Sequence, residues 1–155
     1  MGPFPDGVYR AQFPYYYRNP EGMPQEAALD YYLNSIKDVF EQCGPADSIA
    51  AIVVEPLQGE GGFIPAPIEW VKAVRKLCDE NGILLVADEV QTGFCRTGRM
   101  FATQYWEEAG VQPDILATAK SIAAALKTIE IMERDDLAGC SCEIGEKVSK
   151  RFNEW

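Results

Sequence analysis

Two ionisable residues, Asp88 and Lys120, follow short apolar runs of the chain. Asp88 comes directly after residues 83–87, and Lys120 follows residues 115–118. Such runs are typical of buried strands in parallel sheets, which place their chemistry at the carboxyl ends of the strands. A carboxylate and an amine brought together there can hold the ring nitrogen and the aldehyde of one cofactor. The amine forms a Schiff base, and the acid pairs with the protonated nitrogen.

Alternating strand and helix patterns are expected to position these two residues. The expected elements are, in order, a helix over residues 26–42, a strand over 48–54, a helix from Pro67 to Asn81, a strand over 83–87, a short helix over 101–109 and a short strand over 115–118. This β-α-β-α-β order predicts a parallel sheet with right-handed crossovers. Glu55, Asp88 and Lys120 would then lie at the same edge of the sheet, since each follows a strand.

The two ends of the chain follow other patterns. Residues 1–25 are rich in Pro, Gly and Tyr without periodicity, which predicts an irregular segment whose aromatic side chains pack on the domain surface. After Lys120, two apolar stripes with helical spacing predict two helices and no further strand. The stripes consist of Ile122, Leu126, Ile129 and Met132, and of Leu137, Ile144, Val148 and Phe152.

Length and composition are those of an ordinary globular domain. A chain of 155 residues suits one domain, and its 47% hydrophobic and 25% charged residues are typical of soluble proteins. No apolar run approaches the roughly 18 residues of a membrane span, and the start of the chain lacks the basic region of a signal peptide. We therefore expect a cytoplasmic protein without a membrane partner. The net charge of −10 argues against a nucleic-acid partner.

The Cys and His contents limit the kinds of site. The five cysteines are scattered without a CxxC pair, and the chain has no His. We therefore expect free thiols, no disulfide framework and no metal site. The absence of His also removes Ser-His and Cys-His nucleophile pairs.

Other interpretations of the acidic strand end are weaker. Adjacent strand residues point to opposite faces, so Asp88 and Glu89 cannot both line one hydrolase site. Aliphatic residues followed by Asp-Glu also end the Walker B strand of nucleotide-binding proteins, but this chain lacks the phosphate-binding G-x-x-x-x-G-K-[ST] loop. A solvated acid pair, and a solvated Lys120, are the non-functional alternatives.

Three sequence segments together resemble one family. Residues 84–98, LLVADEVQTGFCRTG, and residues 113–123, PDILATAKSIA, are similar to class III (fold type I) aminotransferases. Residues 55–62, EPLQGEGG, resemble the branch that contains 4-aminobutyrate and related ω-amino-acid aminotransferases. The resemblance implies an α/β fold: a partial large domain over residues 1–123, with a short, mostly parallel sheet and flanking helices. Residues 124–155 would be a helical segment similar to the start of the C-terminal region.

The resemblance assigns a role to each site residue around pyridoxal 5'-phosphate (PLP). Lys120 would form the Schiff base and then move the proton between substrate carbon and cofactor. Asp88 would stabilise the protonated pyridine nitrogen, Val90 would pack on the ring face, and Gln91 would hydrogen-bond the phenolic oxygen.

Two further glutamates are assigned by the same resemblance. Glu55 would support the cofactor side, and Glu60 would form a switchable ion pair with a substrate-gating Arg in the C-terminal part of the family. Cys95 stands where the family usually has Gly. This is the one difference from the family's motif. Because Gly is favoured at positive φ, the family's Gly predicts a positive φ here, which a Cys adopts less readily.

The resemblance also predicts missing parts. The family's phosphate-cradling turn and ring-stacking aromatic residue precede the matched region. The chain passes from Ala123 into Ala124 where the family has several dozen further residues, and the C-terminal domain is absent. We therefore expect weak PLP affinity and little or no transamination.

Two hypotheses of different classes follow. The first is a shortened, impaired aminotransferase, whose family partners would be a small-molecule amino donor, a 2-oxo acid and a second subunit of a homodimer. The second is a non-catalytic α/β remnant that acts only as an interaction or oligomerising module.

Overall fold

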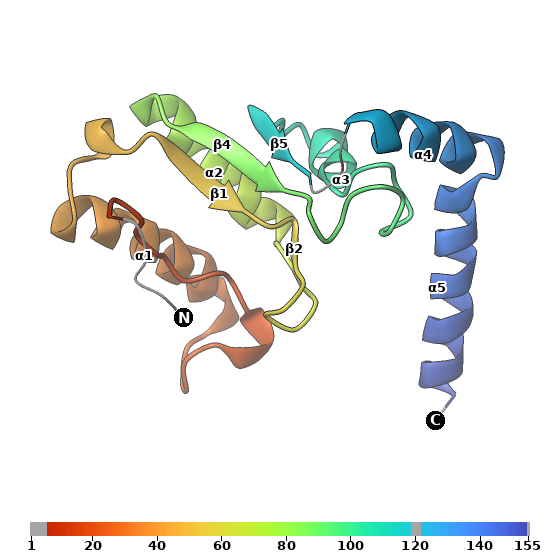
Figure 1. The fold of residues 1–155 in the computed structure, drawn as a ribbon. Helices are drawn as coiled ribbons and strands as arrows, with labels where there is room; N and C mark the ends of the chain where they lie inside the picture. Colours follow the sequence, from red (N-terminus) through yellow and green to blue (C-terminus); the bar gives the residue numbers. More distant parts are fainter. Residues whose placement is uncertain (1–5, 119–121, 155) are drawn as a thin grey trace. The chain divides into compact units, whose positions relative to one another are not determined.

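The computed structural model describes residues 6–118 and 122–154, and side chains in the second range from residue 126 onwards. The chain divides into two compact units. Figure 1 labels the helices and strands that they contain. The first contains Met1–Ile52 and Ala66–Leu84, and the second contains Val53–Pro65 and Leu85–Trp155. The candidate site residues Glu55, Glu60, Asp88, Val90 and Gln91 all belong to the second unit.

The first unit is built on two packed helices. A short 3₁₀ turn, η2 (Gln25–Ala27), leads into α1 (Ala28–Gln42), and α1 contacts α2 (Ile68–Asn81). The buried residues of the two helices recur at helical spacing, as the sequence predicts: Tyr32 and Ile36 from α1, and Trp70, Val71, Val74, Leu77 and Cys78 from α2. Gly82 ends α2 in the left-handed conformation, with φ of 67°.

The aromatic N-terminal segment packs on these helices in part. The ring centroid of Phe13 lies 5.7 Å from that of Trp70, and Tyr16 stacks on Tyr32 at 5.9 Å. Tyr17, at the middle of η1 (Tyr16–Arg18), is 86% exposed. The predicted packing is therefore confirmed for Phe13 and Tyr16 and wrong for Tyr17.

Three short strands form one sheet in the order β1-β4-β5. They are β1 (Ala51–Val54), β4 (Leu84–Asp88) and β5 (Ile115–Ala117). β4 and β5 are parallel, and their register pairs Val86 with Ile115 and Asp88 with Ala117. The predicted strands and the predicted parallel pairing of these two are confirmed.

The start of β1 was wrongly expected at Ser48. Residues Ala46–Ser48 instead form a 3₁₀ turn, η3, in which the Ser48 hydroxyl donates to the Pro45 carbonyl at 2.7 Å. Side-chain bonding of this kind competes with strand hydrogen bonds, so the strand begins at Ala51.

A small hairpin follows β1. β2 (Leu57–Gln58) pairs with β3 (Ile64–Pro65) in antiparallel register. In the turn, the Gly59 carbonyl accepts hydrogen bonds from Gly62 N–H at 3.1 Å and Phe63 N–H at 3.3 Å. Gly62 and Phe63 both have positive φ, at 119° and 57°.

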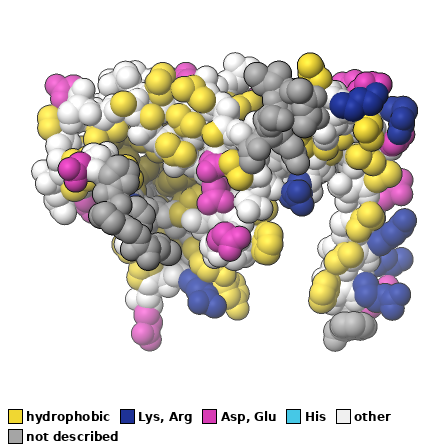
Figure 2. All heavy atoms as spheres, in the orientation of Figure 1, with side chains coloured by type: hydrophobic (Ala, Val, Ile, Leu, Met, Phe, Trp, Pro, Cys, Tyr) yellow, Lys and Arg dark blue, Asp and Glu magenta, His cyan; other side chains and the backbone are white. Residues whose placement is uncertain are grey.

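The second unit also contains helices, which loops connect to the strands. Its helices are α3 (Thr103–Glu108), α4 (Ile122–Arg134) and α5 (Leu137–Asn153), as the sequence predicts. Along α5, hydrophobic side chains occupy one side and Lys and Arg the other (Figure 2). Within the described residues, no helix combines the length and the apolar character that crossing a membrane requires. The domain boundary between residues 123 and 124 stays a prediction.

Candidate active site

Asp88 is the last residue of β4 and is half-buried. Its Oδ1 accepts a hydrogen bond from Val90 N–H at 3.0 Å, which turns the chain out of the strand. Val90 itself is 50% exposed, and Gln91 is exposed as well. The three residues that are expected to hold a cofactor ring therefore leave the sheet together and remain accessible to a ligand.

The hairpin contributes a second side of the site. Glu55 Oε2 accepts a hydrogen bond from Gly59 N–H at 2.9 Å. A Cβ atom at Gly59 would lie 2.9 Å from Gln91 Cγ, so a larger residue here would force the Gln91 side chain to shift. Glu55, Gly59 and Gln91 are thus brought together, and Glu55 fixes the turn that contacts Gln91. Glu60 is exposed on the turn.

Lys120 lies outside the described residues. The strand that leads to it is described, and Ala117 is the register partner of Asp88. The Glu89 N–H donates to the Ala117 carbonyl at 2.9 Å and continues the ladder by one residue. The described end of β5 therefore lies beside Asp88, and the position of Lys120 itself stays a prediction.

The burial of Glu89 was not predicted from the sequence. Its side chain is 1% exposed and accepts hydrogen bonds from three donors. The strand alternation that separates it from Asp88 indicated that it faces the other side. Two of its three donors lie 13 and 14 residues further along the chain, at Ala102 and Thr103, and no local pattern marks them.

The loop after Gln91 contains the Cys that replaces the family glycine. Cys95 has φ of 66° and its neighbour Phe94 has φ of 59°. The expectation that this position favours glycine for its positive φ is confirmed. Cys95 is buried, and its pKa is raised by burial and, to a smaller extent, by the negative charge of Asp136. All five cysteines are free, as predicted.

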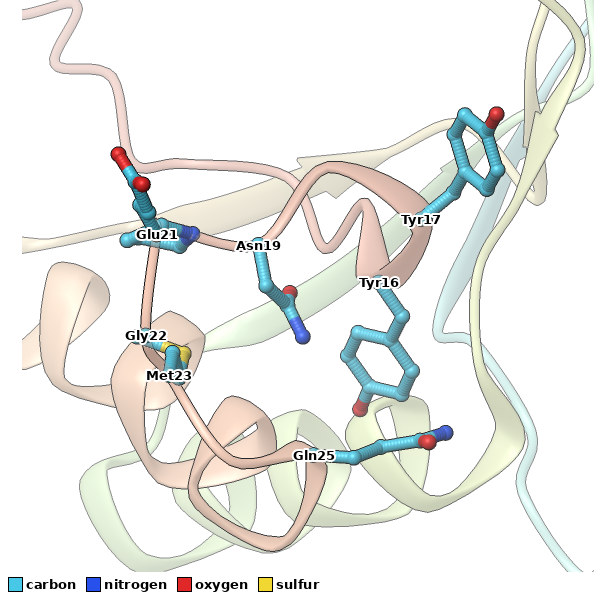
Figure 3. A pocket seen from close by; sticks show the side chains of 8 residues that line it. Tyr16, Tyr17, Asn19, Glu21, Gly22, Met23 and Gln25 are labelled. Atoms are coloured by element: carbon cyan, nitrogen blue, oxygen red, sulfur yellow. The ribbon is translucent and has the colours of Figure 1, made fainter.

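An open pocket of about 510 Å³ lies in the first unit and contains none of the predicted site residues. Tyr16 and Asn19 point into it, whereas Tyr17 points away (Figure 3). Burial, followed by the nearby negative charge of Glu69, raises the pKa of Tyr16 to about 12. Because Tyr16 also stacks on Tyr32, its first role is in the packing of this unit.

The sequence comparison places the chain in a family. The profile of the Aminotransferase class-III family matches residues 1–148. The chain therefore belongs to the class III aminotransferases, and its partial α/β fold is that of the fold type I PLP transaminases.

Two curated proteins illustrate the similarity. A probable 4-aminobutyrate aminotransferase of Bacillus subtilis is 42% identical over 88% of this chain and 31% of its own length. The 5-aminovalerate aminotransferase DavT of Pseudomonas putida is 37% identical over 99% of this chain and 42% of its own length. The chain thus spans 31% and 42% of the lengths of these two relatives. The alignment with DavT runs over 189 positions, more than the chain's 155 residues, so DavT contains residues without a counterpart here.

A solved structure agrees with this assignment. The amine transaminase from an uncultivated Pseudomonas species, in a PLP-bound form, superposes with a TM-score of 0.79 at 30% identity. The match covers 94% of this chain and 42% of that one.

Proposed function

We propose that this chain carries the ring-binding half of a PLP site from an ω-amino-acid aminotransferase. The observation that supports it most is the end of β4, where Asp88 pairs with β5 in the strand register and turns directly into Val90 and Gln91. The parent reaction would move an amino group from an ω-amino acid, such as 4-aminobutyrate, to a 2-oxo acid.

The described side chains fit the ring of PLP. Asp88 Oδ1 accepts a hydrogen bond from Val90 N–H, and Oδ2 would accept one from the protonated ring nitrogen of PLP. Val90 would cover one face of the ring with its exposed apolar side chain, and Gln91 would donate to the phenolic oxygen. When bound, PLP supplies an electron sink at the substrate carbon. Lys120 would hold the cofactor covalently and move the proton at its Nζ.

Substrate and partners are proposed from the same resemblance. Glu55 would support the cofactor side through the Gly59 turn, and Glu60 would gate the substrate. The names of the two curated relatives favour amino donors whose amine lies at the end of the carbon chain. A homodimer and a cytoplasmic location remain predictions from the sequence.

We propose that the activity of this chain is impaired. The described residues offer groups for the ring, but none is assigned to the phosphate of PLP or to the carboxylate of a substrate. The length of the DavT alignment supports an internal loss, which the sequence resemblance predicts near residues 123–125. Turnover of 4-aminobutyrate with 2-oxoglutarate by the purified chain, at rates ordinary for an enzyme, would contradict this part of the proposal.

A trapping experiment separates the two functions. The purified chain would be titrated with PLP, reduced with borohydride and digested for peptide mapping. We expect the reduced adduct to concentrate on Lys120. Uniform labelling of exposed lysines, such as Lys127 and Lys147, would instead favour the non-catalytic remnant.

One observation favours the remnant as the second candidate. Several large apolar side chains of the second unit are exposed, among them Val53 at 64%, Leu116 at 41% and Phe152 at 68%. Apolar surface on short edge strands is typical of interaction sites. An oligomerising module would use this surface without any cofactor.

A further inference from the structure

Glu89 is a buried carboxylate surrounded by neutral donors. Thr92 Oγ1 and Ala102 N–H donate to Oε2 at 2.5 and 3.1 Å, and Thr103 N–H donates to Oε1 at 2.7 Å. A buried carboxylate costs several kcal/mol unless it is hydrogen-bonded, and bonds to a charged acceptor are stronger than neutral ones. The three donors therefore hold the carboxylate in place, and the carboxylate holds the donors.

The backbone of Glu89 joins two further segments. Its N–H donates to the Ala117 carbonyl of β5 at 2.9 Å, and its carbonyl accepts from Gly93 N–H at 2.9 Å. A Cβ atom at Gly93 would lie 2.9 Å from the Glu89 carbonyl oxygen, so the loop packs closely here. Glu89 is thus bonded to the strand that leads to Lys120, to the loop after Gln91, and to the start of α3.

The segments that Glu89 joins lie directly beside the proposed cofactor residues in the sequence. Asp88 precedes Glu89, while Val90 and Gln91 lie between Glu89 and its hydrogen-bond partner Thr92. A shift of the Glu89 side chain would therefore change the direction of Asp88 and Gln91 together. Misplacement of a binding group by about 1 Å can cost a hundredfold in an enzymatic rate.

We propose that Glu89 is the positioning residue of this site: its carboxylate, held by Thr92, Ala102 and Thr103, sets the direction in which Asp88 and Gln91 meet the ring of PLP. The assignment rests on the proposed function. It makes Glu89 act through Asp88 and Gln91, without contact to the cofactor.

Two conservative substitutions test the assignment. Glu89→Gln keeps the size of the side chain but replaces one acceptor oxygen with an NH₂ donor, so at least one backbone N–H of Ala102 or Thr103 loses its acceptor. Thr92→Val, the matched control, removes one side-chain donor and leaves both backbone bonds in place. Asp88→Asn serves as the reference for loss of the acid at the ring nitrogen.

Three measurements apply to each full-length variant: far-UV circular dichroism, the fraction of borohydride-trapped PLP on Lys120, and the pH titration of the ring nitrogen in that trapped adduct. We expect Glu89→Gln to reduce labelling of Lys120 by about tenfold. It should also lower the pH midpoint of the ring nitrogen toward that of Asp88→Asn, because a displaced Asp88 stabilises the ring proton less. Thr92→Val should shift both quantities in the same direction by a smaller amount. A change in fold stability alone would not move the ring-nitrogen titration.

The outcomes separate this assignment from the proposed function. If the unchanged chain labels Lys120 and Glu89→Gln labels and titrates like it, the Glu89 assignment is wrong while the proposed function stands. If the unchanged chain does not label Lys120, the proposed function fails and the assignment with it. If Glu89→Gln loses its helical dichroism, Thr92→Val decides: an intermediate midpoint supports the assignment, and an unchanged midpoint contradicts it.

Discussion

Two adjacent acids show how the surroundings of a residue decide its role. Asp88 is half-buried and bonded to one backbone N–H, so it can still receive a ligand. Glu89 is 1% exposed and accepts hydrogen bonds from three protein donors, which suits the positioning role that we propose for it. Strand alternation turns the two side chains to opposite faces, and the contacts with Ala102 and Thr103 bury only Glu89.

At position 95, glycine should give a more stable protein than alanine, which is the opposite of the usual order. With φ of 66°, any side chain at this position is strained, and glycine is not. We expect Cys95→Gly to be about 1 kcal/mol more stable than Cys95→Ala, although both lose the same buried thiol. Urea unfolding of the two variants measures the difference. Equal stability, or a more stable Ala variant, would show that the loop is not held in the left-handed conformation.

Tyr16 should ionise at a higher pH than an ordinary tyrosine. Its pKa of about 12, against a usual 10.0, means that the folded state favours the neutral phenol. The corresponding stabilisation is complete below about pH 10 and is lost as the pH rises through about 12. The tyrosine absorbance near 295 nm should therefore contain a phase at high pH that belongs to Tyr16. Tyr16→Phe should remove this late phase and Tyr17→Phe should keep it; the reverse result would reject the assignment.

At the scale of elements, short hydrogen-bonded turns direct the strands and helices toward the site. The Glu55–Gly59 bond shapes the β2–β3 turn against Gln91, and the Glu89 bonds attach the start of α3 to the end of β4. At the other end of the unit, the Asp136 side chain accepts from Gly139 N–H and caps α5. In each case one carboxylate orients a backbone segment.

Two glycines of α5 should respond in opposite ways to alanine. Gly145 has open space around its Cβ position, so Gly145→Ala should stabilise the helix by about 0.5–1 kcal/mol. A Cβ atom at Gly139 would collide with the Asp136 carboxylate that caps the helix, and loss of a cap costs about 1 kcal/mol. Thermal unfolding followed by far-UV dichroism compares them. A Gly139→Ala variant as stable as Gly145→Ala would contradict the cap.

The sequence was sufficient for elements with a clear period and insufficient for contacts between distant residues. The helical stripe of α2 and the apolar run of β4 predicted both elements to within a residue or so. The two-residue strands of the hairpin are too short to show alternation. The start of β1 was misplaced because the Ser48 hydroxyl bonds the Pro45 carbonyl and holds residues 46–48 in a 3₁₀ turn. Glu89 was missed because its burial depends on Ala102 and Thr103.

At the scale of the whole molecule, apolar surface is left uncovered within the second unit. β1 is an edge strand in the sheet order, and its Val53 is 64% exposed. Exposed edge strands pair with other chains unless a charge interrupts them. The net charge of −10 opposes such association, and salt weakens this protection by screening.

We therefore expect the chain to self-associate more strongly as salt is raised. Val53→Lys should reduce this association, since it places a charge on the exposed edge. Asn153→Lys adds the same charge at the end of α5 and serves as the control. Analytical ultracentrifugation at low and high salt measures both. If Val53→Lys associates as the unchanged chain does, the β1 edge is not the contact surface.

The central claim is that Asp88 and Lys120 meet at one cofactor ring, and the most direct measurement compares Lys120 labelling between the unchanged chain and Asp88→Asn. Asn keeps the shape of Asp but cannot balance the positive ring nitrogen, and a hydrogen bond to a charged group contributes about 1.5–3 kcal/mol. The predicted result is that borohydride-trapped PLP on Lys120 falls by roughly tenfold or more in Asp88→Asn, while labelling of the exposed Lys127 and Lys147 is unchanged. Equal labelling of Lys120 in the two proteins would contradict the account.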